Sequence, residues 1–479
     1  MYRAINSKIL DRAGAYDLSE VYMVSYASTG GDKNPVRVNI SGLVQEMNIY
    51  EHLENDVLSG DMVLADADNL LYKFPVTGFE RLEFKLNTPG LDKGLDCSIS
   101  TGYPMFVYSV SERKPVNPRT QGYIINFCSI EAIKNHQKRV CKSLATTIDD
   151  MVVNVLRNDL KTQKNIFVEE TSGTHKYTLP LEKPFTTIKN LGKFAKSKNF
   201  DNSGYLFYEN IFGFHFKSYE SLFCKGNGQP RPEVAFYTPK VKNEKVRNTI
   251  NDMQSVEDFT IKSQFNTLKN VQSGTYSSRM ITHDSFNKTF KTYDFNYNTN
   301  YINQNHLEMG PKGEKIDNNG IVPYFNFEEG QGFSDFYEGV LHLSSHTQKI
   351  HNDFELPNPG EITQKRVSQK NALGSIVIEI IIPGFTGITV GDIVRFNTPK
   401  YTSASKAEPN DNDPYMSGRF LISGLRHHIS VPGKRHTTIL ELVKDSTSIA
   451  FAEEDLDLFT NNQSEEGDNY LQYDIDNLS

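Results

Sequence analysis

The chain has 479 residues, and 51 Lys and Arg against 59 Asp and Glu give a formal net charge of −8. At roughly 150 residues per domain, this length predicts about three domains. The acidic balance argues against non-specific nucleic-acid binding, which needs a basic surface. Hydrophobic residues make up 37% of the chain, enough for several packed cores, so wholesale disorder is excluded.

The sequence contains no segment suited to crossing a membrane. The longest apolar run, 376–382, is broken by Glu379 and is far shorter than the roughly 20 residues that span a bilayer. Residues 1–14 lack the apolar region of a secretory signal. We therefore expect no stable membrane association and assembly in the cytoplasm.

The cysteines are widely separated, and no Cys-x-x-Cys pair occurs that could form a zinc site. In a reducing cytoplasm, such residues are expected to be buried free thiols and not disulfide partners. They are Cys97, Cys128, Cys141 and Cys224.

The charge is unevenly distributed along the chain. The segment 446–479 contains nine acidic and no basic residues, so residues 1–445 are close to neutral. A solvated terminus is one interpretation of this acidic tail. Aromatic and aliphatic residues such as Phe459 and Tyr473 are interleaved with the acids, as in segments that order on a partner. Both interpretations remain open.

The first 140 residues have the pattern of β-strands. Apolar and polar residues alternate over 36–40 and 123–127, as in half-buried strands, and further apolar runs occupy 79–86 and 105–110. Gly, Asn, Asp and Pro separate these runs at short intervals, which favours an antiparallel barrel or sandwich.

The period of the apolar residues changes after residue 140. The spacing predicts a helix over 147–161, in which Thr147 and Asp150 resemble a capping box. A second helix is predicted from Pro184, and the aromatic runs 205–208 and 212–216 predict a hairpin. Together these elements predict a small α/β domain inserted into a β-rich chain.

Strand-like patterns return after this insert. They cover 256–295 and four strong runs in the last third, at 376–382, 392–396, 419–425 and 437–443. The run 376–382 is apolar almost throughout, which predicts a central strand buried on both faces. The stretch 296–336 is rich in Asn and Gly and is expected to form long loops or a partly ordered insertion.

One spacing resembles a catalytic or metal-binding motif. Glu338, His342 and His346 are four residues apart and would share one face of a helix. Leu343 follows the first histidine, so the catalytic glutamate of zinc proteases is missing. A further ligand would have to come from a residue such as His351 or Asp353. An exposed polar helix face near a loop explains the pattern better than a bound metal, and we favour it.

The remaining candidates for chemistry are weaker. His427 and His428 are adjacent in a predicted strand and must point to opposite faces, so one is expected inside and the other exposed. The acidic pairs 149–150 and 328–329 could serve glycoside hydrolysis only if a cleft separated two carboxylates. The basic clusters 134–142 and 240–247 resemble solvated faces.

No motif for a nucleophile or a bound nucleotide occurs. The sequence lacks Gly-x-Ser-x-Gly, a Walker A loop and Gly-x-Gly-x-x-Gly, and Gly330-Gln331-Gly332 has neither the preceding strand nor the third glycine. We therefore predict no catalytic, cofactor-binding or metal-binding residue, no cofactor, and no enzymatic activity.

Several motifs, taken in their order along the chain, resemble one protein family. The C-terminal ones are Gly391–Phe396, Tyr415–Ile422, His427–Ile429 and Thr437–Ser446; those in the middle are Pro184–Ala195, Tyr205–Asn210 and Gly213–Ser218. In this order they resemble the central baseplate hub proteins of contractile-tailed phages, which are related to the VgrG hub. Ile40-Ser41-Gly42 extends the resemblance loosely, so that it covers most of residues 1–445.

The resemblance implies an α+β, mainly β fold with two tail-tube-like antiparallel β-barrel domains and an inserted small α/β domain. The implied boundaries are 1–140 for the first barrel, 141–245 for the insert, 246–295 with 361–445 for the second barrel, 296–360 for a loop-rich insertion, and 446–479 for the acidic tail.

The resemblance also implies the function and the partners. The expected protein is a structural homotrimer of the virion baseplate that joins the hexameric tail tube to the trimeric spike. The expected partners are the spike, the tail tube and other baseplate proteins, with the tape measure protein as a further candidate and no sequence-specific nucleic acid. Two alternatives remain open: a tail-associated cell-wall hydrolase that uses His342 and His346, and a receptor- or glycan-binding tail protein.

Overall fold

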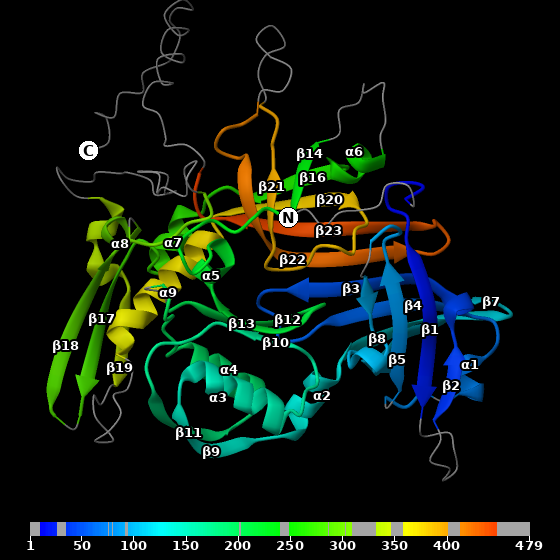
Figure 1. The fold of residues 1–479 in the computed structure, drawn as a ribbon, viewed down its shortest axis with the longest axis horizontal. Helices are drawn as coiled ribbons and strands as arrows, with labels where there is room; N and C mark the ends of the chain where they lie inside the picture. Colours follow the sequence, from blue (N-terminus) through cyan, green and yellow to red (C-terminus); the bar gives the residue numbers. More distant parts are fainter. Residues whose placement is uncertain are drawn as a thin grey trace, which may run out of the picture.

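The computed structural model is mainly β, with short helices packed between and beside the sheets (Figure 1). It describes residues 10–25, 35–74, 76–78, 80–91, 94–200, 203–239, 249–285, 287–301, 303–308, 332–345, 358–400 and 412–447. Within these ranges, no helix is both long and apolar enough to span a membrane.

The first part of the chain forms one half of a large sheet. Its strands are β1 (Asp17–Ser25), β2 (Val36–Asn39), β3 (Val44–His52), β4 (Ser59–Asp66), β5 (Arg81–Asn87), β6 (Leu95–Asp96), β7 (Met105–Asn117) and β8 (Thr120–Ser129). The pairing order is β3-β4-β8-β7-β5-β1-β2. Alternate residues of β8, including Tyr123, Ile125 and Phe127, are buried in one apolar core, as the alternation in the sequence predicts.

The middle of the chain forms a compact unit with its own core. Its elements are α2 (Ile130–Gln137), β9 (Val140–Thr146), α3 (Ile148–Asn154), the π-helical turn η4 (Val155–Asp159), β10 (Ile166–Val168), β11 (His175–Glu182), α4 (Pro184–Gly192), β12 (Tyr205–Asn210) and β13 (Gly213–Ser218). The short helix α5 (Tyr219–Phe223) follows and packs into the core of the second half of the large sheet. The two predicted helices and the predicted hairpin are confirmed.

The predicted capping box is wrong. The Thr147 side chain makes no capping hydrogen bond. Instead, the hydroxyl of Thr171 accepts hydrogen bonds from the amides of Ile148 and Asp149 at 3.1 and 3.2 Å. A hydroxyl from a distant loop therefore satisfies the amide groups that a helix leaves open at its first turn.

The last third forms the other half of the large sheet. Its strands are β14 (Ala235–Pro239), β15 (Ser255–Val256), β16 (Asp258–Ser263), β20 (Ile376–Pro383), β21 (Ile393–Phe396), β22 (Gly418–Ser430) and β23 (Arg435–Lys444); α6 (Thr249–Gln254) precedes β15. Strand β20 is central, between β16 and β23. Only one of its faces is fully buried, because Val377, Glu379 and Ile381 are half-buried, so the predicted burial on both faces is wrong.

The two halves share one order of strand pairing. The first half contains β3-β4-β8-β7-β5, and the second contains β16-β20-β23-β22-β21. Every neighbouring pair in both series is antiparallel. In each series, the first two strands along the chain are neighbours at one end. The fifth strand lies next to them, followed in space by the fourth and then by the third. The same topology thus occurs twice in one chain.

A separate three-stranded sheet packs beside the second half. It consists of β18 (Thr289–Asn296), β17 (Ser277–Asp284) and β19 (Leu341–Ser345), in that order. The helices α7 (Thr267–Gln272), α8 (Tyr297–Tyr301) and α9 (Pro359–Leu373) lie around it (Figure 1). Strand β19 and α8 belong to the range 296–360, where the sequence predicts loops.

The cysteines only partly match the prediction. All four are free, and Cys97, Cys128 and Cys224 are buried, but Cys141 is exposed. Cys141 follows the buried Val140 in β9, and the alternation of side chains along a strand turns it outward.

Candidate functional site

The histidine spacing does not form a helical face, so that prediction is wrong. Glu338 lies in the short 3-10 turn η6 (Tyr337–Gly339), and His342 lies on β19. Glu338 accepts a hydrogen bond from Arg279 at 3.1 Å, and burial lowers the pKa of His342. His346, His351 and Asp353 lie outside the described residues. No group of three or more metal-binding side chains occurs among the residues described.

The other sequence candidates have structural partners. Asp149 accepts a hydrogen bond from the hydroxyl of Thr171 at 2.6 Å, and Asp150 accepts one from Thr146 at 2.9 Å. Lys142 donates to Asn154 at 2.6 Å and pairs with Asp159. The prediction of a solvated basic face over 134–142 is therefore wrong at Lys142. The acidic pair 328–329 and the basic cluster 240–247 lie outside the described residues.

The feature that best distinguishes this fold is the pairing between its two halves. Strand β22 is shared: its first residues pair with β21, and its last seven, Gly424–Ser430, pair antiparallel with Glu46–His52 of β3. The large sheet therefore runs without interruption from β16 through β20, β23, β22, β3 and β4 to β8 (Figure 1).

One face of this continuous sheet is polar. Five polar residues lie directly opposite one another on the consecutive strands β23, β22, β3, β4 and β8. They are Thr437, His428, Asn48, Asp61 and Asn126. The amide of Asn48 donates to Asp61 at 2.9 Å, and its oxygen accepts from Arg426 at 3.0 Å. A row of hydrogen-bonded side chains therefore crosses from one half to the other on the face opposite the apolar cores.

The polar face has slightly more acidic than basic groups. It contains the carboxylates of Glu46, Asp61, Glu379 and Glu441, and the cations of Lys262 and Arg426. The hydrogen bond from His52 is the main cause that lowers the pKa of Glu441 to about 2. Burial, reinforced by the hydrogen bond to Asp61, raises the pKa of Tyr50 to about 12. Glu441 is therefore ionised and Tyr50 protonated at neutral pH.

The prediction that His427 and His428 point to opposite faces is confirmed, but only the buried ring is placed as predicted, because the other is half-buried and not exposed. His427 is fully buried, whereas His428 is half-buried on the polar face. The Nδ1 atom of His427 lies 3.0 Å from Nε2 of His436. Burial lowers the pKa of His427 to about 4, and burial together with the neighbouring histidines holds the pKa of His436 well below its usual value. Both rings are therefore neutral structural groups.

A buried carboxyl group fastens β3 to the loop before β21. Glu51 of β3 is almost fully buried, and it accepts hydrogen bonds from the hydroxyl of Thr389 and from the amide of Val390, the latter at 3.2 Å. Burial is the main cause that raises the pKa of Glu51 to about 7.

A buried ion cluster fastens the insert to the first half of the sheet. Lys164 pairs with Glu209 of β12 and, at 3.1 Å, with Glu131 of α2; their side chains are 0–2% exposed. Glu209 also accepts a hydrogen bond from the amide of Leu58 at 2.9 Å. Burial disfavours the charged lysine, but the two carboxylates outweigh it and raise the pKa of Lys164.

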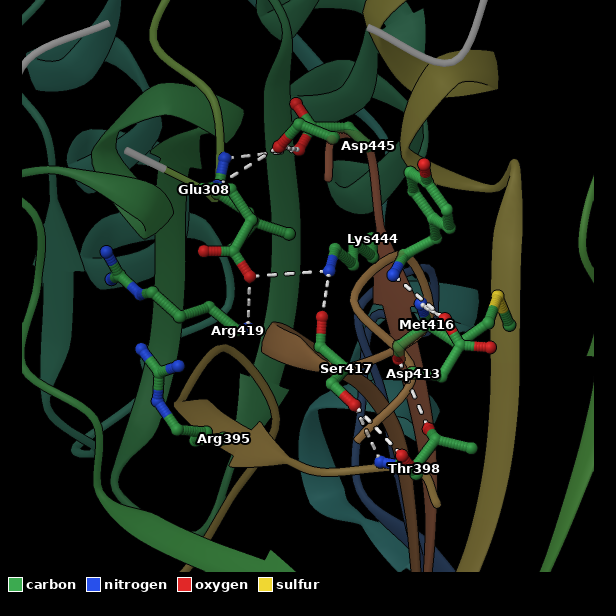
Figure 2. Close-up of polar contacts among 12 residues, drawn as sticks. Glu308, Arg395, Thr398, Asp413, Met416, Ser417, Arg419, Lys444 and Asp445 are labelled. Carbon is green, nitrogen blue, oxygen red and sulfur yellow. Dashed lines mark hydrogen bonds and ion pairs between the residues drawn. The ribbon is translucent and has the colours of Figure 1, made fainter. Parts of the chain in front are cut away.

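A second buried cluster lies at the end of β22 and β23 (Figure 2). Lys444 donates to the carbonyl of Ser417 at 2.6 Å and lies 3.3 Å from Glu308. Glu308 accepts from the amide of Arg419 at 2.5 Å, and Asp445 accepts from the amide of Leu307 at 3.1 Å. These contacts fix residues 306–308 against the last strands.

The sequence alone indicates neither cluster. Lys164 and Glu308 belong to ordinary polar stretches, and the partners of all the buried charges come from distant parts of the chain. A lysine that lies among apolar residues, such as Lys444 after Leu442 and Val443, is the one local signal that could have suggested a buried charge.

Comparison with known proteins identifies one similar sequence. The chain is 26% identical over 429 residues to the probable baseplate hub protein gp334 of Vibrio phage KVP40, covering 86% of this chain and 93% of that protein. The resemblance to baseplate hub proteins is thereby confirmed. A baseplate hub is a structural part of a phage tail, so this relative agrees with the expectation of a non-enzymatic protein. No protein-family model matches the chain.

Two solved structures of tail proteins match most of the chain at low identity. The tail protein from Neisseria meningitidis MC58 is 10% identical, with a TM-score of 0.49 and coverage of 90% of this chain and 97% of that one. The 43 kDa tail protein of prophage MuSo2 from Shewanella oneidensis is also 10% identical, with a TM-score of 0.49 and coverage of 90% and 100%.

Proposed function

Because the chain resembles a phage baseplate hub protein along most of its length, we propose that it is the structural central hub of a contractile phage tail. The sequence similarity to the Vibrio phage hub protein is the observation that carries this proposal. In this role the protein is part of the virion and acts through contacts with other tail proteins, with no reaction of its own.

The hub is a homotrimer that joins the hexameric tail tube to the trimeric spike. The repeated strand order supports this proposal, because two similar β-units per chain give six equivalent units from three chains. Closed rings need such repeating surfaces. The units are barrel-like, with boundaries near 1–140 for the first and 246–295 with 361–445 for the second, and the insert 141–245 lies between them.

The polar face of the continuous sheet lines the central channel. It crosses the junction between the two halves without a break, and its acidic groups outnumber its Lys and Arg. DNA binds to proteins mainly through Lys and Arg contacts to phosphates, so a face without a basic excess lets DNA pass without adhering. The spike, other baseplate proteins and the tape measure protein are the partners at the ends of the channel.

Light scattering of the purified full chain tests the proposal together with low-resolution imaging. We expect a stable trimer, seen as a ring with a lumen wide enough for duplex DNA. A compact monomer at concentrations that favour assembly would contradict it. Zymography on cell-wall material separates the hub from a hydrolase, because lysis that disappears in His342→Ala would identify an enzyme.

A further inference from the structure

The repeated strand order also indicates how one copy of the chain contacts the next. Within the chain, β22 of the second half pairs with β3 of the first half. In the series defined above, β22 is the fourth strand along the chain and β3 is the first. The equivalent of β22 in the first half is β7, and the equivalent of β3 in the second half is β16.

Both equivalents have an open edge. Strand β7 pairs with β5 only through Met105 and Phe106, and among the described residues no strand pairs with the same edge beyond this point. Strand β16 pairs with β20 on one side, and the described part of the chain supplies no strand on its other side. An open strand edge exposes unpaired amide and carbonyl groups that favour pairing with another strand.

We infer that the edge of β7, at residues 108–114, pairs antiparallel with β16 of a second copy of this chain. This inference rests on the proposed trimeric hub and names its interface. Pro115 has no amide hydrogen to donate, which sets the limit of the pairing on β7. The contact is head to tail, so it repeats around a closed ring of chains.

The charges on the two edges match those of the junction within the chain. There, β22 contributes Arg426 and His428, and β3 contributes Glu46, which lies 3.3 Å from the His428 ring. Strand β7 carries Glu112, Arg113 and Lys114, and β16 begins with Asp258 and carries Lys262 near its end. Arg426 and Arg113 both lie four residues before the end of their strands. Antiparallel pairing would place Arg113 and Lys114 beside Asp258, as the basic residues of β22 lie beside Glu46.

The exposure of apolar side chains also favours a covered surface. Tyr108 on β7 is 53% exposed, and Ile261 on β16 is 40% exposed. The seven residues of β22 that pair with β3 are all buried or half-buried, whereas residues 112–117 at the corresponding end of β7 are exposed. Pairing with a second copy would bury this end of β7 as β3 buries the end of β22.

Charge reversal tests the pairing in the full chain. We expect Arg113→Glu with Lys114→Glu, and separately Asp258→Lys, to raise the concentration for half-assembly at least about tenfold, measured by light scattering. The chain that combines all three substitutions again presents opposite charges and should recover the trimer. Lys176→Glu, an exposed reversal on β11 in the insert, is the matched control and should assemble like the wild type.

The outcomes separate this inference from the proposed function. A trimeric wild type whose edge variants also remain trimeric overturns the inference and leaves the hub intact. A monomeric wild type overturns both. A combined variant that is folded by circular dichroism but stays monomeric shows that these two edges do not pair with each other.

Covalent linkage provides a second test that does not depend on the charge variants folding. In a Cys141→Ser background, which removes the exposed thiol, Lys114→Cys with Asp258→Cys should give linked dimers and trimers under mild oxidation. Either cysteine alone should give no linked trimer. If the double-cysteine chain remains monomeric on a non-reducing gel while the protein is trimeric in solution, the inference is wrong.

Discussion

The carboxylate of Glu51 accepts a hydrogen bond from the amide of Val390 at 3.2 Å, although the two residues are 339 positions apart. This contact ties β3 of the first half to the loop before β21 of the second half. Because Glu51 is buried and its pKa is raised to about 7, its protonation state affects the stability of the folded protein.

The first prediction concerns the pH dependence that Glu51 causes. Its pKa is higher in the folded than in the unfolded chain, so the folded state binds more protons between about pH 4.5 and 7 and stability falls as the pH rises. The full effect is on the order of 3 kcal/mol. Urea unfolding at pH 5 and pH 8 should show that the free energy of unfolding falls less between these two values for Glu51→Gln than for the wild type. Identical losses would contradict this assignment.

The buried histidine pair should have the opposite pH dependence. The pKa of His427 is lowered to about 4 in the folded chain, so the unfolded state binds more protons between about pH 4 and 6.5. Stability should therefore fall on acidification through this window, and less so in His427→Asn. Unfolding free energies at pH 4.5 and 6.5 measure the difference. His136→Asn, which changes an exposed histidine in the last turn of α2, is the control.

Removal of the Lys164 charge should destabilise the chain strongly. Lys164→Met leaves Glu131 and Glu209 buried without a cation, and breaking such a pair costs about 3–5 kcal/mol. The triple variant with Glu131→Gln and Glu209→Gln should recover part of the loss, because it removes the uncompensated charges. Urea unfolding at pH 7 measures both. A triple variant less stable than Lys164→Met would contradict this account.

The glycine at the start of β22 should tolerate no side chain. Gly418 has φ +127°, and an added Cβ would lie 1.8 Å from the Glu308 carboxylate that binds Lys444. Gly418→Ala should therefore cost at least about 2 kcal/mol, since a strained φ alone costs about 1–3 kcal/mol. The control is Gly42→Ala, where nothing lies within 4 Å, and it should change stability by less than about 0.5 kcal/mol. Thermal unfolding distinguishes the two.

Sequence patterns predicted the local elements well, because these depend on neighbouring residues. The helix from Pro184 and the hairpin of β12 and β13 follow from periodicity and turn residues within about 30 positions. The spacing of Glu338 and His342 led to a wrong prediction of a helix, because residues four positions apart share one face of a strand as well as one face of a helix. The alternation of Leu341, His342 and Leu343 was the better guide to β19.

The junction of the two halves could not be predicted from the sequence. The pairing of Gly424 with His52 joins strands that are hundreds of residues apart, and no local pattern records which edge meets which. The two buried partners of Lys164 come from separate elements, α2 and β12, for the same reason. The family resemblance rests on the order of the motifs, and it does not indicate which residues meet at the junction.

The cluster of Glu308, Lys444 and Asp445 has a consequence for how this protein can vary. Buried contacts of this cluster join residues 306–308, the start of β22 and the end of β23, which are far apart in the chain. Because these charged groups are buried, a substitution at one position favours a compensating substitution at another. Related chains should therefore differ at these three positions together, although more than 100 residues separate Glu308 from Lys444 and Asp445.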